Sequence, residues 1–190
     1  MREPKGALRA VKKILGTFRN KANPKGDVGK LIWYHEIDKP AMKLRVYLDT
    51  SVFSAYFDDR VTDRQAETEL FWQRLNQYEV STSELAHEEL LQTNTPDLRA
   101  KLLKMLEPFF VHPVTPEMKE LARFYIAGSA FSPVMFNDAL HVAAAVMTRQ
   151  DVLLSWNFKH LVNRRRRAII NQLNISKGLP TVDIIAPPEI

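Results

Sequence analysis

The sequence predicts an α/β fold in which helices cover both faces of a parallel sheet. Short apolar runs typical of buried strands alternate with runs of helical length, the order that builds parallel sheets through helical crossovers. The chain has 190 residues, which suits one domain with a sizeable core. Its residues are 45% apolar and 26% charged, as in ordinary globular proteins.

The first half of the body begins with an apolar strand and continues with helical patterns. In the helix expected at residues 62–77, Ala66, Leu70 and Leu75 are predicted to face the core. Pro96 stands at a first-turn position where proline is tolerated, so it indicates the start of another helix. In order, we expect a strand at 44–48, a helical turn at 51–57, a helix at 62–77, a strand at 78–81, and helices at 84–92 and 96–106.

The second half repeats the alternation and contains the most apolar helix of the chain. In order, we expect a strand at 109–112, helices at 116–127 and 137–148, a strand at 152–155, a basic helix at 163–174 and a strand at 182–185. The Ala-rich composition of 137–148 indicates that this helix is buried. The sequence has no glycine-rich phosphate loop, which argues against a Rossmann or Walker nucleotide site.

The composition excludes several classes of protein. There is no cysteine, so disulfides, thiolate zinc sites, iron–sulfur clusters and a cysteine nucleophile are ruled out, and a reducing cytoplasmic location is expected. No apolar run approaches the roughly 20 residues that span a membrane, and the N-terminus lacks the apolar core of a signal peptide. The net charge is +5, which suggests a polyanionic partner such as nucleic acid.

The positive charge is concentrated in residues 1–41, which hold 10 Lys and Arg against 4 Asp and Glu, whereas the body is nearly neutral. Within this segment, residues 7–22 have the pattern of a basic amphipathic helix, and a turn signal follows at 23–27. We expect either an arm for RNA, a membrane surface or a partner, or an appendage that is weakly ordered alone. Translation starting at Met42, just before the first strand, is a third interpretation.

Two polar residues follow strands at the edge of the sheet where open α/β folds bind ligands. Asp49 comes directly after the first strand, and Asn157 follows the fourth. Each has an alternative interpretation as a turn or cap residue, because Asp, Asn, Ser and Thr cap helices well.

Two further acids stand where the helical pattern is apolar. Glu89 shares a helix face with Leu85, where an unpaired carboxylate is costly unless a cation or metal matches it. Asp138 opens the buried helix, where it could also serve only to complement the helix dipole. His141, one turn later, is expected to be a hydrogen-bonded core residue rather than a metal ligand.

Three acids and one amide at one end of a sheet would make an all-oxygen site. Hard cations such as Mg²⁺ and Mn²⁺ prefer this ligand set. Since Mg²⁺ keeps several waters and binds phosphate oxygens, the chemistry that such a site favours is metal-assisted hydrolysis of a phosphodiester.

The order and spacing of four short motifs resemble those of the PIN-domain ribonucleases, and most of all the VapC-type toxins of toxin–antitoxin pairs. The motifs are Tyr47-Leu48-Asp49-Thr50-Ser51, Ser83 through Glu89-Leu90, Asn137-Asp138-Ala139-Leu140-His141 and Leu154-Ser155-Trp156-Asn157-Phe158. The resemblance covers roughly residues 43–188. It implies a PIN-like domain at 42–190, built as a three-layer α/β/α sandwich around a central parallel sheet, with Mg²⁺ or Mn²⁺ in an acidic pocket.

The resemblance also assigns roles to individual residues. Asp49, Glu89 and Asp138 match the family's metal-binding and catalytic acids, with Glu89 as a ligand or as the group that orients a metal-bound water. Asn157 stands where many members have a fourth acid, so a second metal is expected to bind less firmly. Ser51 and Ser155 are second-tier candidates for positioning water or phosphate. The implied reaction is hydrolysis of RNA that leaves a 5′-phosphate and a 3′-hydroxyl.

An acidic pocket repels RNA, so basic residues have to hold the RNA backbone around it. The candidates in the body are Arg164, Arg165, Arg166 and Arg167, whose alternative is a solvated helix face. By analogy with the family, we expect an antitoxin protein and a homodimer as partners, and no membrane. Two alternatives stay open: a catalytically weakened PIN-like module that binds RNA or a partner, and a metal-dependent phosphatase or nuclease acting on a substrate other than RNA.

Overall fold

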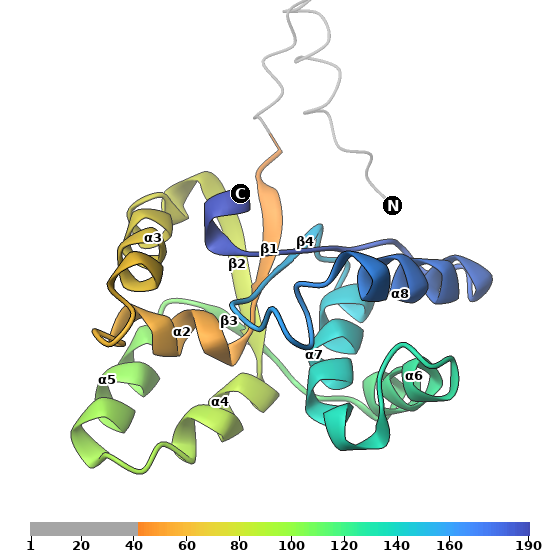
Figure 1. Ribbon diagram of the computed structural model, residues 1–190, viewed down its shortest axis with the longest axis horizontal. Helices are drawn as coiled ribbons and strands as arrows, with labels where there is room; N and C mark the ends of the chain where they lie inside the picture. Colours follow the sequence, from red (N-terminus) through yellow and green to blue (C-terminus); the bar gives the residue numbers. More distant parts are fainter. Residues whose placement is uncertain (1–41) are drawn as a thin grey trace, which may run out of the picture. The chain divides into compact units, whose positions relative to one another are not determined.

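The computed structural model describes residues 42–190, so the basic extension expected at 1–41 lies outside the described part. Its centre is a five-stranded parallel sheet with the strand order β3-β2-β1-β4-β5 (Figure 1). The strands are β1 (Leu44–Leu48), β2 (Tyr78–Ser83), β3 (Phe110–His112), β4 (Val152–Leu154) and β5 (Asp183–Ile185). All four neighbouring pairs are parallel, which confirms the sheet type predicted from the sequence.

The helices lie where the periodicity places them, within a few residues. They are α2 (Thr50–Tyr56), α3 (Thr62–Gln73), α4 (Glu84–Leu91), α5 (Pro96–Leu106), α6 (Pro116–Ala127), α7 (Phe136–Met147) and α8 (Arg164–Ser176), with short 3₁₀ turns at Leu75–Gln77, Pro133–Met135 and Pro187–Glu189. No helix within residues 42–190 combines the length and the apolar character that crossing a membrane requires.

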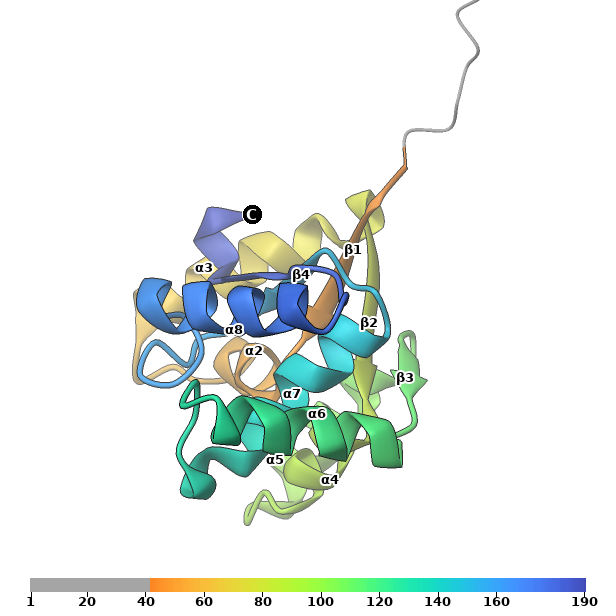
Figure 2. The same ribbon diagram turned by 90° about the vertical axis from the view of Figure 1, so that its right-hand side faces the viewer.

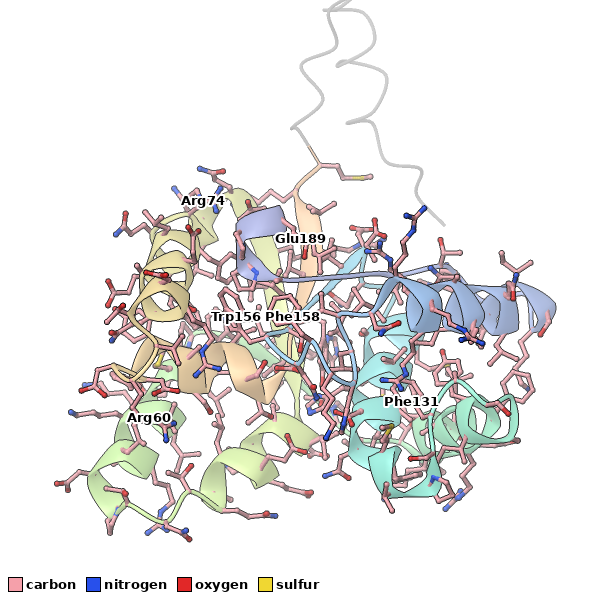
Figure 3. All side chains as sticks on the ribbon, viewed as in Figure 1. Arg60, Arg74, Phe131, Trp156, Phe158 and Glu189 are labelled. Atoms are coloured by element: carbon pink, nitrogen blue, oxygen red, sulfur yellow. The ribbon has the colours of Figure 1, made fainter. Side chains whose placement is uncertain are left out.

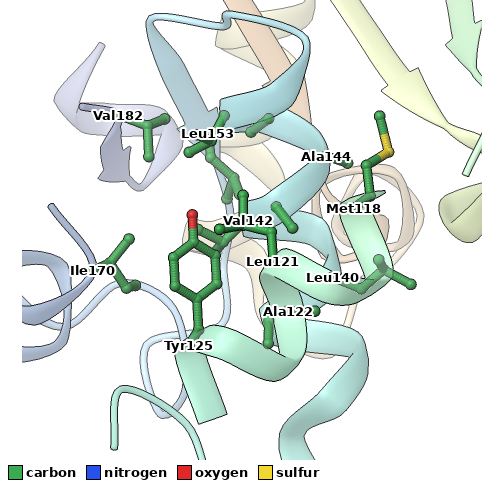
Figure 4. Close-up of a cluster of buried hydrophobic side chains, with 14 of the residues drawn as sticks. Met118, Leu121, Ala122, Tyr125, Leu140, Val142, Ala144, Leu153, Ile170 and Val182 are labelled. Carbon is green, nitrogen blue, oxygen red and sulfur yellow. The ribbon is translucent and has the colours of Figure 1, made fainter. Parts of the chain in front are cut away.

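Helices cover the sheet on both faces, which confirms the three-layer α/β/α sandwich. Figures 1 and 2 show α2, α3 and α5 on one side of the central strands and α6, α7 and α8 on the other. The alternation of side chains along β1 explains the two layers, because Val46 and Leu48 pack into one core and Tyr47 into the other. Figure 4 shows the second core, where Tyr125 of α6 packs among residues of α7, β4 and α8.

The register of β1 and β4 sets where their following residues lie. Val46 pairs with Val152 and Leu48 with Leu154, so Asp49 and Ser155 leave the sheet side by side. The backbone N–H of Asp49 still donates to the carbonyl of Leu154, over 3.1 Å. The two strand exits that the sequence singles out are therefore adjacent.

The core face predicted for the helix at 62–77 is confirmed at Leu75, which is partly buried against the core, and is wrong at the other two residues. Ala66 and Leu70 are exposed, with 49% of Leu70 accessible, and the buried residues are Thr68 and Phe71. The burial of the large Phe71 ring outweighs that of the smaller Ala66, and Thr68 turns inward with it because it accepts a hydrogen bond from the Trp156 indole N–H. The α-helix also ends earlier than expected, at Gln73, and a 3₁₀ turn follows.

Candidate functional site

Asp49 is the most buried acid at the carboxyl ends of the strands, with 4% of its surface exposed. It is the N-cap of α2, and its Oδ1 accepts hydrogen bonds from the Ser51 backbone N–H, over 2.6 Å, and from the Ser51 hydroxyl. Its Oδ2 accepts from the Ser155 hydroxyl, over 2.5 Å. Burial raises the pKa of Asp49 above its usual value, although the nearby His141 and these serine donors oppose the rise.

The two serines connect the exits of β1 and β4. The Ser51 hydroxyl accepts from the Trp156 N–H over 2.7 Å, and the Ser155 hydroxyl accepts from the Asn157 N–H over 2.9 Å. The hydroxyl oxygens of Ser51 and Ser155 lie 3.4 Å apart. Both side chains therefore hold Asp49 and the loop after β4 in place, and a role toward water or phosphate stays a prediction.

Glu89 is half-buried on α4, and one hydroxyl, one amide and one imidazole surround its carboxylate. Its Oε2 accepts from the Thr50 hydroxyl over 2.5 Å, and its Oε1 accepts from the Asn137 amide over 2.9 Å. The imidazole Nε2 of His141 lies 3.1 Å from Oε2. Burial alone would raise the pKa of Glu89, but His141 and the hydrogen bonds from Thr50 and Asn137 outweigh it and lower the pKa to about 2.

His141 links Glu89 to the core, as the sequence predicts for this residue. It is 3% exposed, and its Nδ1 lies 2.8 Å from the Tyr47 hydroxyl, which in turn lies 2.6 Å from the Ser83 hydroxyl. If Nε2 carries the proton toward Glu89, Nδ1 accepts from Tyr47 and Tyr47 accepts from Ser83, so every group is satisfied. A buried relay thus fixes the orientation of Glu89.

Asp138, in the first turn of α7, is held by two residues of the loop after β4. Its Oδ1 accepts from the Asn157 amide over 2.9 Å, and its Oδ2 lies 3.0 Å from the Nδ1 of His160. His160 was not among the residues predicted from the sequence. The available signal was its position three residues after Asn157 on the same loop, together with the ability of histidine to donate to a carboxylate. Thr50 and Asn137, which hold Glu89, were missed as well.

Hydrogen bonds connect Asp49 with Asp138, and Glu89 is held by residues next to these two acids along the chain. Asp49 connects to Asp138 through Ser155 and Asn157, and Glu89 contacts Thr50, the neighbour of Asp49, and Asn137, the neighbour of Asp138. Among residues 42–190, no lysine or arginine forms an ion pair with Asp49, Glu89 or Asp138, and the imidazoles of His141 and His160 contact Glu89 and Asp138. Within the same residues, however, no three His, Asp or Glu side chains are arranged as a group that could hold a metal ion.

The four arginines at the start of α8 divide into two pairs. Arg166 donates to the carbonyls of Ala130, over 2.8 Å, and of His160, and its guanidinium lies over the Phe131 ring. Arg167 donates to the carbonyl of Ile184 over 3.2 Å. Arg164 and Arg165 are exposed, so they are the two that remain accessible to a phosphate. The role of the four residues in RNA binding stays a prediction.

No known family description and no curated protein matches the sequence, but several solved structures resemble the fold. Three of them are VapBC toxin–antitoxin proteins. A VapBC2 structure from Rickettsia felis, bound to a DNA fragment from its promoter, has a TM-score of 0.49 at 13% identity and covers 75% of this chain and 98% of that one. VapBC-5 from Mycobacterium tuberculosis has a TM-score of 0.44 at 22% identity, with the same coverage. A DNA-bound VapBC from Salmonella typhimurium has a TM-score of 0.49 at 13% identity and covers 76% and 98%.

Asn157 stands where the motif resemblance leads us to expect an acid, and the structure shows what the amide does there. Its nitrogen donates to Asp138, and its oxygen accepts from the backbone N–H of His160 over 3.0 Å. Asn157 therefore shapes the loop after β4 and orients Asp138. Next to it, Trp156 and Phe158 lie in contact, with ring centroids 5.9 Å apart (Figure 3).

Proposed function

We propose that this chain is a divalent-metal-dependent endoribonuclease and the toxin of a toxin–antitoxin pair. The observation that carries the proposal is the set of three partly or fully buried acids at the carboxyl ends of the strands, without a lysine or arginine paired to them in residues 42–190. Burial makes the negative charge of Asp49 costly unless a cation balances it, and Mg²⁺ or Mn²⁺ prefers such oxygen ligands.

The hydrogen bonds of the acids leave some of their acceptor sites unused. A carboxylate offers about four lone-pair sites. Asp49 uses three of them, Glu89 three and Asp138 two among the described residues, so each acid keeps at least one acceptor site. We infer that Asp138 and Asp49 would hold the cation, with Glu89 as a third ligand or as the group that orients a water.

The cation would supply charge neutralisation of the phosphate and a lower pKa for the attacking water. The residues of this chain would position these groups. Ser51 and Ser155 fix Asp49, and the relay from Ser83 through Tyr47 and His141 fixes Glu89. The exposed pair Arg164 and Arg165 would contact the RNA backbone. An antitoxin partner and a homodimer are proposed by analogy with the resembled family, and a cytoplasmic location is proposed from the cysteine-free composition.

The experiment is cleavage of single-stranded RNA by the full chain with Mg²⁺, with Mn²⁺ and with EDTA. Asp49→Asn and Asp138→Asn are expected to lower the rate by about 100-fold or more, since several kcal/mol of charge stabilisation would be lost. Asp97→Asn, at an exposed acid in the first turn of α5, is the matched control. Full activity of both site variants, or activity in EDTA, would refute the assignment.

A second candidate is a module that binds RNA or a protein partner without cleaving RNA. It is favoured by the finding that the described residues contain no ready three-ligand group, and by the amide at position 157. Calorimetric titration of Mn²⁺ separates the two candidates. Binding that Asp138→Asn abolishes supports the nuclease, whereas RNA binding without Mn²⁺ binding or cleavage supports the module. Single-stranded DNA and a phosphomonoester in the same assay test the substrate class.

A further inference from the structure

The imidazole of His160 has one hydrogen-bond partner among the described residues, the carboxylate of Asp138. Its Nδ1 lies 3.0 Å from the Asp138 Oδ2. Its Nε2 is buried and has no partner in residues 42–190. Because an ionised carboxylate can only accept hydrogen bonds, Nδ1 carries the proton of this contact. The hydrogen bonding of the ring is therefore directed to Asp138 alone in the part of the chain that the structure describes.

Neither ring nitrogen of His160 is open to a substrate or a metal ion. Nδ1 is engaged by Asp138, and the burial of Nε2 separates it from anything bound at the site. A metal ligand needs a free ring nitrogen, and a general acid or base needs one that reaches the reacting atoms. Any role of His160 in the proposed reaction therefore has to act through Asp138.

The two hydrogen bonds to Asp138 come from one loop and reach different oxygens. The Asn157 amide donates to Oδ1 over 2.9 Å, and His160 donates to Oδ2. A carboxylate held at one oxygen can turn about its Cβ–Cγ bond, whereas a carboxylate held at both oxygens cannot turn without breaking a hydrogen bond. His160 thus fixes the plane of the Asp138 carboxylate, and each oxygen keeps an acceptor site for a cation.

Hydrogen bonds hold the backbone of His160 on both sides. Its N–H donates to the Oδ1 of Asn157 over 3.0 Å. The N–H groups of Leu161 and Val162 donate to the Asn157 carbonyl over 2.8 and 2.9 Å, so the loop is folded around Asn157. The His160 carbonyl accepts from the guanidinium of Arg166 at the start of α8. The loop therefore fixes where the imidazole stands relative to α7.

We propose that His160 is a positioning residue that orients the Asp138 carboxylate for the divalent cation. This proposal rests on the proposed function, because the cation belongs to that site. Removing a group that orients a metal-binding side chain commonly weakens metal binding by about 10- to 100-fold. Without the Nδ1–H, the carboxylate could turn, and a cation would have to restrict it again on binding. A residue that only stabilised the loop would affect unfolding and leave the metal affinity of the folded protein unchanged.

The test is calorimetric titration of the full chain with Mn²⁺, comparing the wild type with three variants. His160→Ala removes the donor, His160→Gln moves an amide N–H to the position of Nε2, and His160→Asn keeps an amide N–H at the position of Nδ1. We expect about tenfold weaker Mn²⁺ binding for the Ala and Gln variants, and an affinity within about threefold of the wild type for the Asn variant. His87→Ala, at an exposed histidine of α4, is the control and should bind Mn²⁺ like the wild type.

A second measurement needs no metal ion. In EDTA, His160→Ala should lower the urea midpoint of the wild type, and should lower it clearly less in an Asp138→Ala background, because the contact is already lost there. The nitrogen NMR shifts of the His160 ring should show a proton on Nδ1. An unprotonated Nδ1, or an equal fall of the midpoint in both backgrounds, would overturn the proposal.

The outcomes of the titration separate this proposal from the proposed function. Absence of Mn²⁺ binding by the wild type would overturn the proposed function, and with it the role of His160 toward a cation. Equal Mn²⁺ affinity of the wild type, the Ala variant and the Gln variant would overturn the role of His160 alone. Equally weak binding by all three variants would overturn it as well, because the proposal requires that asparagine restores the affinity.

Discussion

The pH dependence of stability at Glu89 is a direct consequence of the hydrogen bonds that surround its carboxylate. Thr50, Asn137 and His141 favour the charged form and lower its pKa from 4.5 to about 2. A lowered pKa means that the native state binds fewer protons than the unfolded chain between these two values. The stabilisation is therefore complete above pH 4.5 and is lost as the pH falls toward 2.

The size of this stabilisation follows from the same figures. A fall from 4.5 to about 2 corresponds to roughly 3 kcal/mol at neutral pH. Because 24% of the Glu89 side chain is exposed, solvent screening reduces the amount to about 2 kcal/mol. Glu89→Gln keeps the shape and one acceptor oxygen but removes the charge. We expect this substitution to lower the free energy of unfolding by about 2 kcal/mol at pH 7 and by only about 1 kcal/mol at pH 3.5.

Urea denaturation of the wild type and of Glu89→Gln at pH 7, 5 and 3.5, all in EDTA, measures the difference. Glu88→Gln is the matched control, because Glu88 is the exposed neighbour on the same helix and its substitution should change the midpoint little. Equal stability of Glu89→Gln and the wild type at pH 7 would refute the reasoning. So would a difference that persists unchanged at pH 3.5.

Three other substitutions are expected to change stability or metal binding. Asp49→Asn should raise the urea midpoint at pH 7 in EDTA. Burial raises the pKa of Asp49 in the folded state, so its negative charge destabilises the wild type. This destabilisation is absent below pH 3.8 and grows as the pH rises. A lower midpoint contradicts this. Tyr47→Phe should lower the midpoint by about 1–3 kcal/mol in unfolding free energy, because Ser83 and His141 lose their buried partner; an unchanged midpoint would disprove the relay. Asn157→Asp should destabilise the chain in EDTA by about 1–2 kcal/mol through repulsion from Asp138, yet bind Mn²⁺ more tightly than the wild type in calorimetry. Weaker Mn²⁺ binding would count against a cation at Asp138.

The elements that sequence reasoning placed best carry strong local signals. The helices at 96–106 and 116–127 were predicted with the bounds that the structure has, because a proline marks the first turn of each. The face of α3 was predicted wrongly because its apolar residues do not follow a single stripe. Ala66 and Leu70 share one face, but Phe71 occupies another and is the residue that the core buries.

In the site, too, the residues with a local sequence signal could be predicted, whereas contacts between residues far apart in the sequence could not. A strand followed at once by Asp49, and an acid at the start of an apolar helix, can be recognised within a few residues of sequence. The contacts between Glu89 and Thr50 join residues 39 apart, and Asp138 meets His160 through the conformation of the loop after β4. Periodicity carries no information on such contacts, so the partners of the acids could not be predicted.

These partners bear on the chemistry of the acids. The hydroxyls of Thr50, Ser51 and Ser155 and the amides of Asn137 and Asn157 orient the carboxylate oxygens without cancelling their charge. A lysine or arginine in the same places would orient the oxygens equally well, but it would also neutralise them and compete with a cation. A site held mainly by hydroxyls and amides, without lysine or arginine, remains negative in a partly buried setting, where its potential is least screened. Because the hydroxyl and amide partners carry no charge, an interpretation based on charge does not find them in the sequence. For the same reason they leave Asp49, Glu89 and Asp138 free to attract a divalent metal ion.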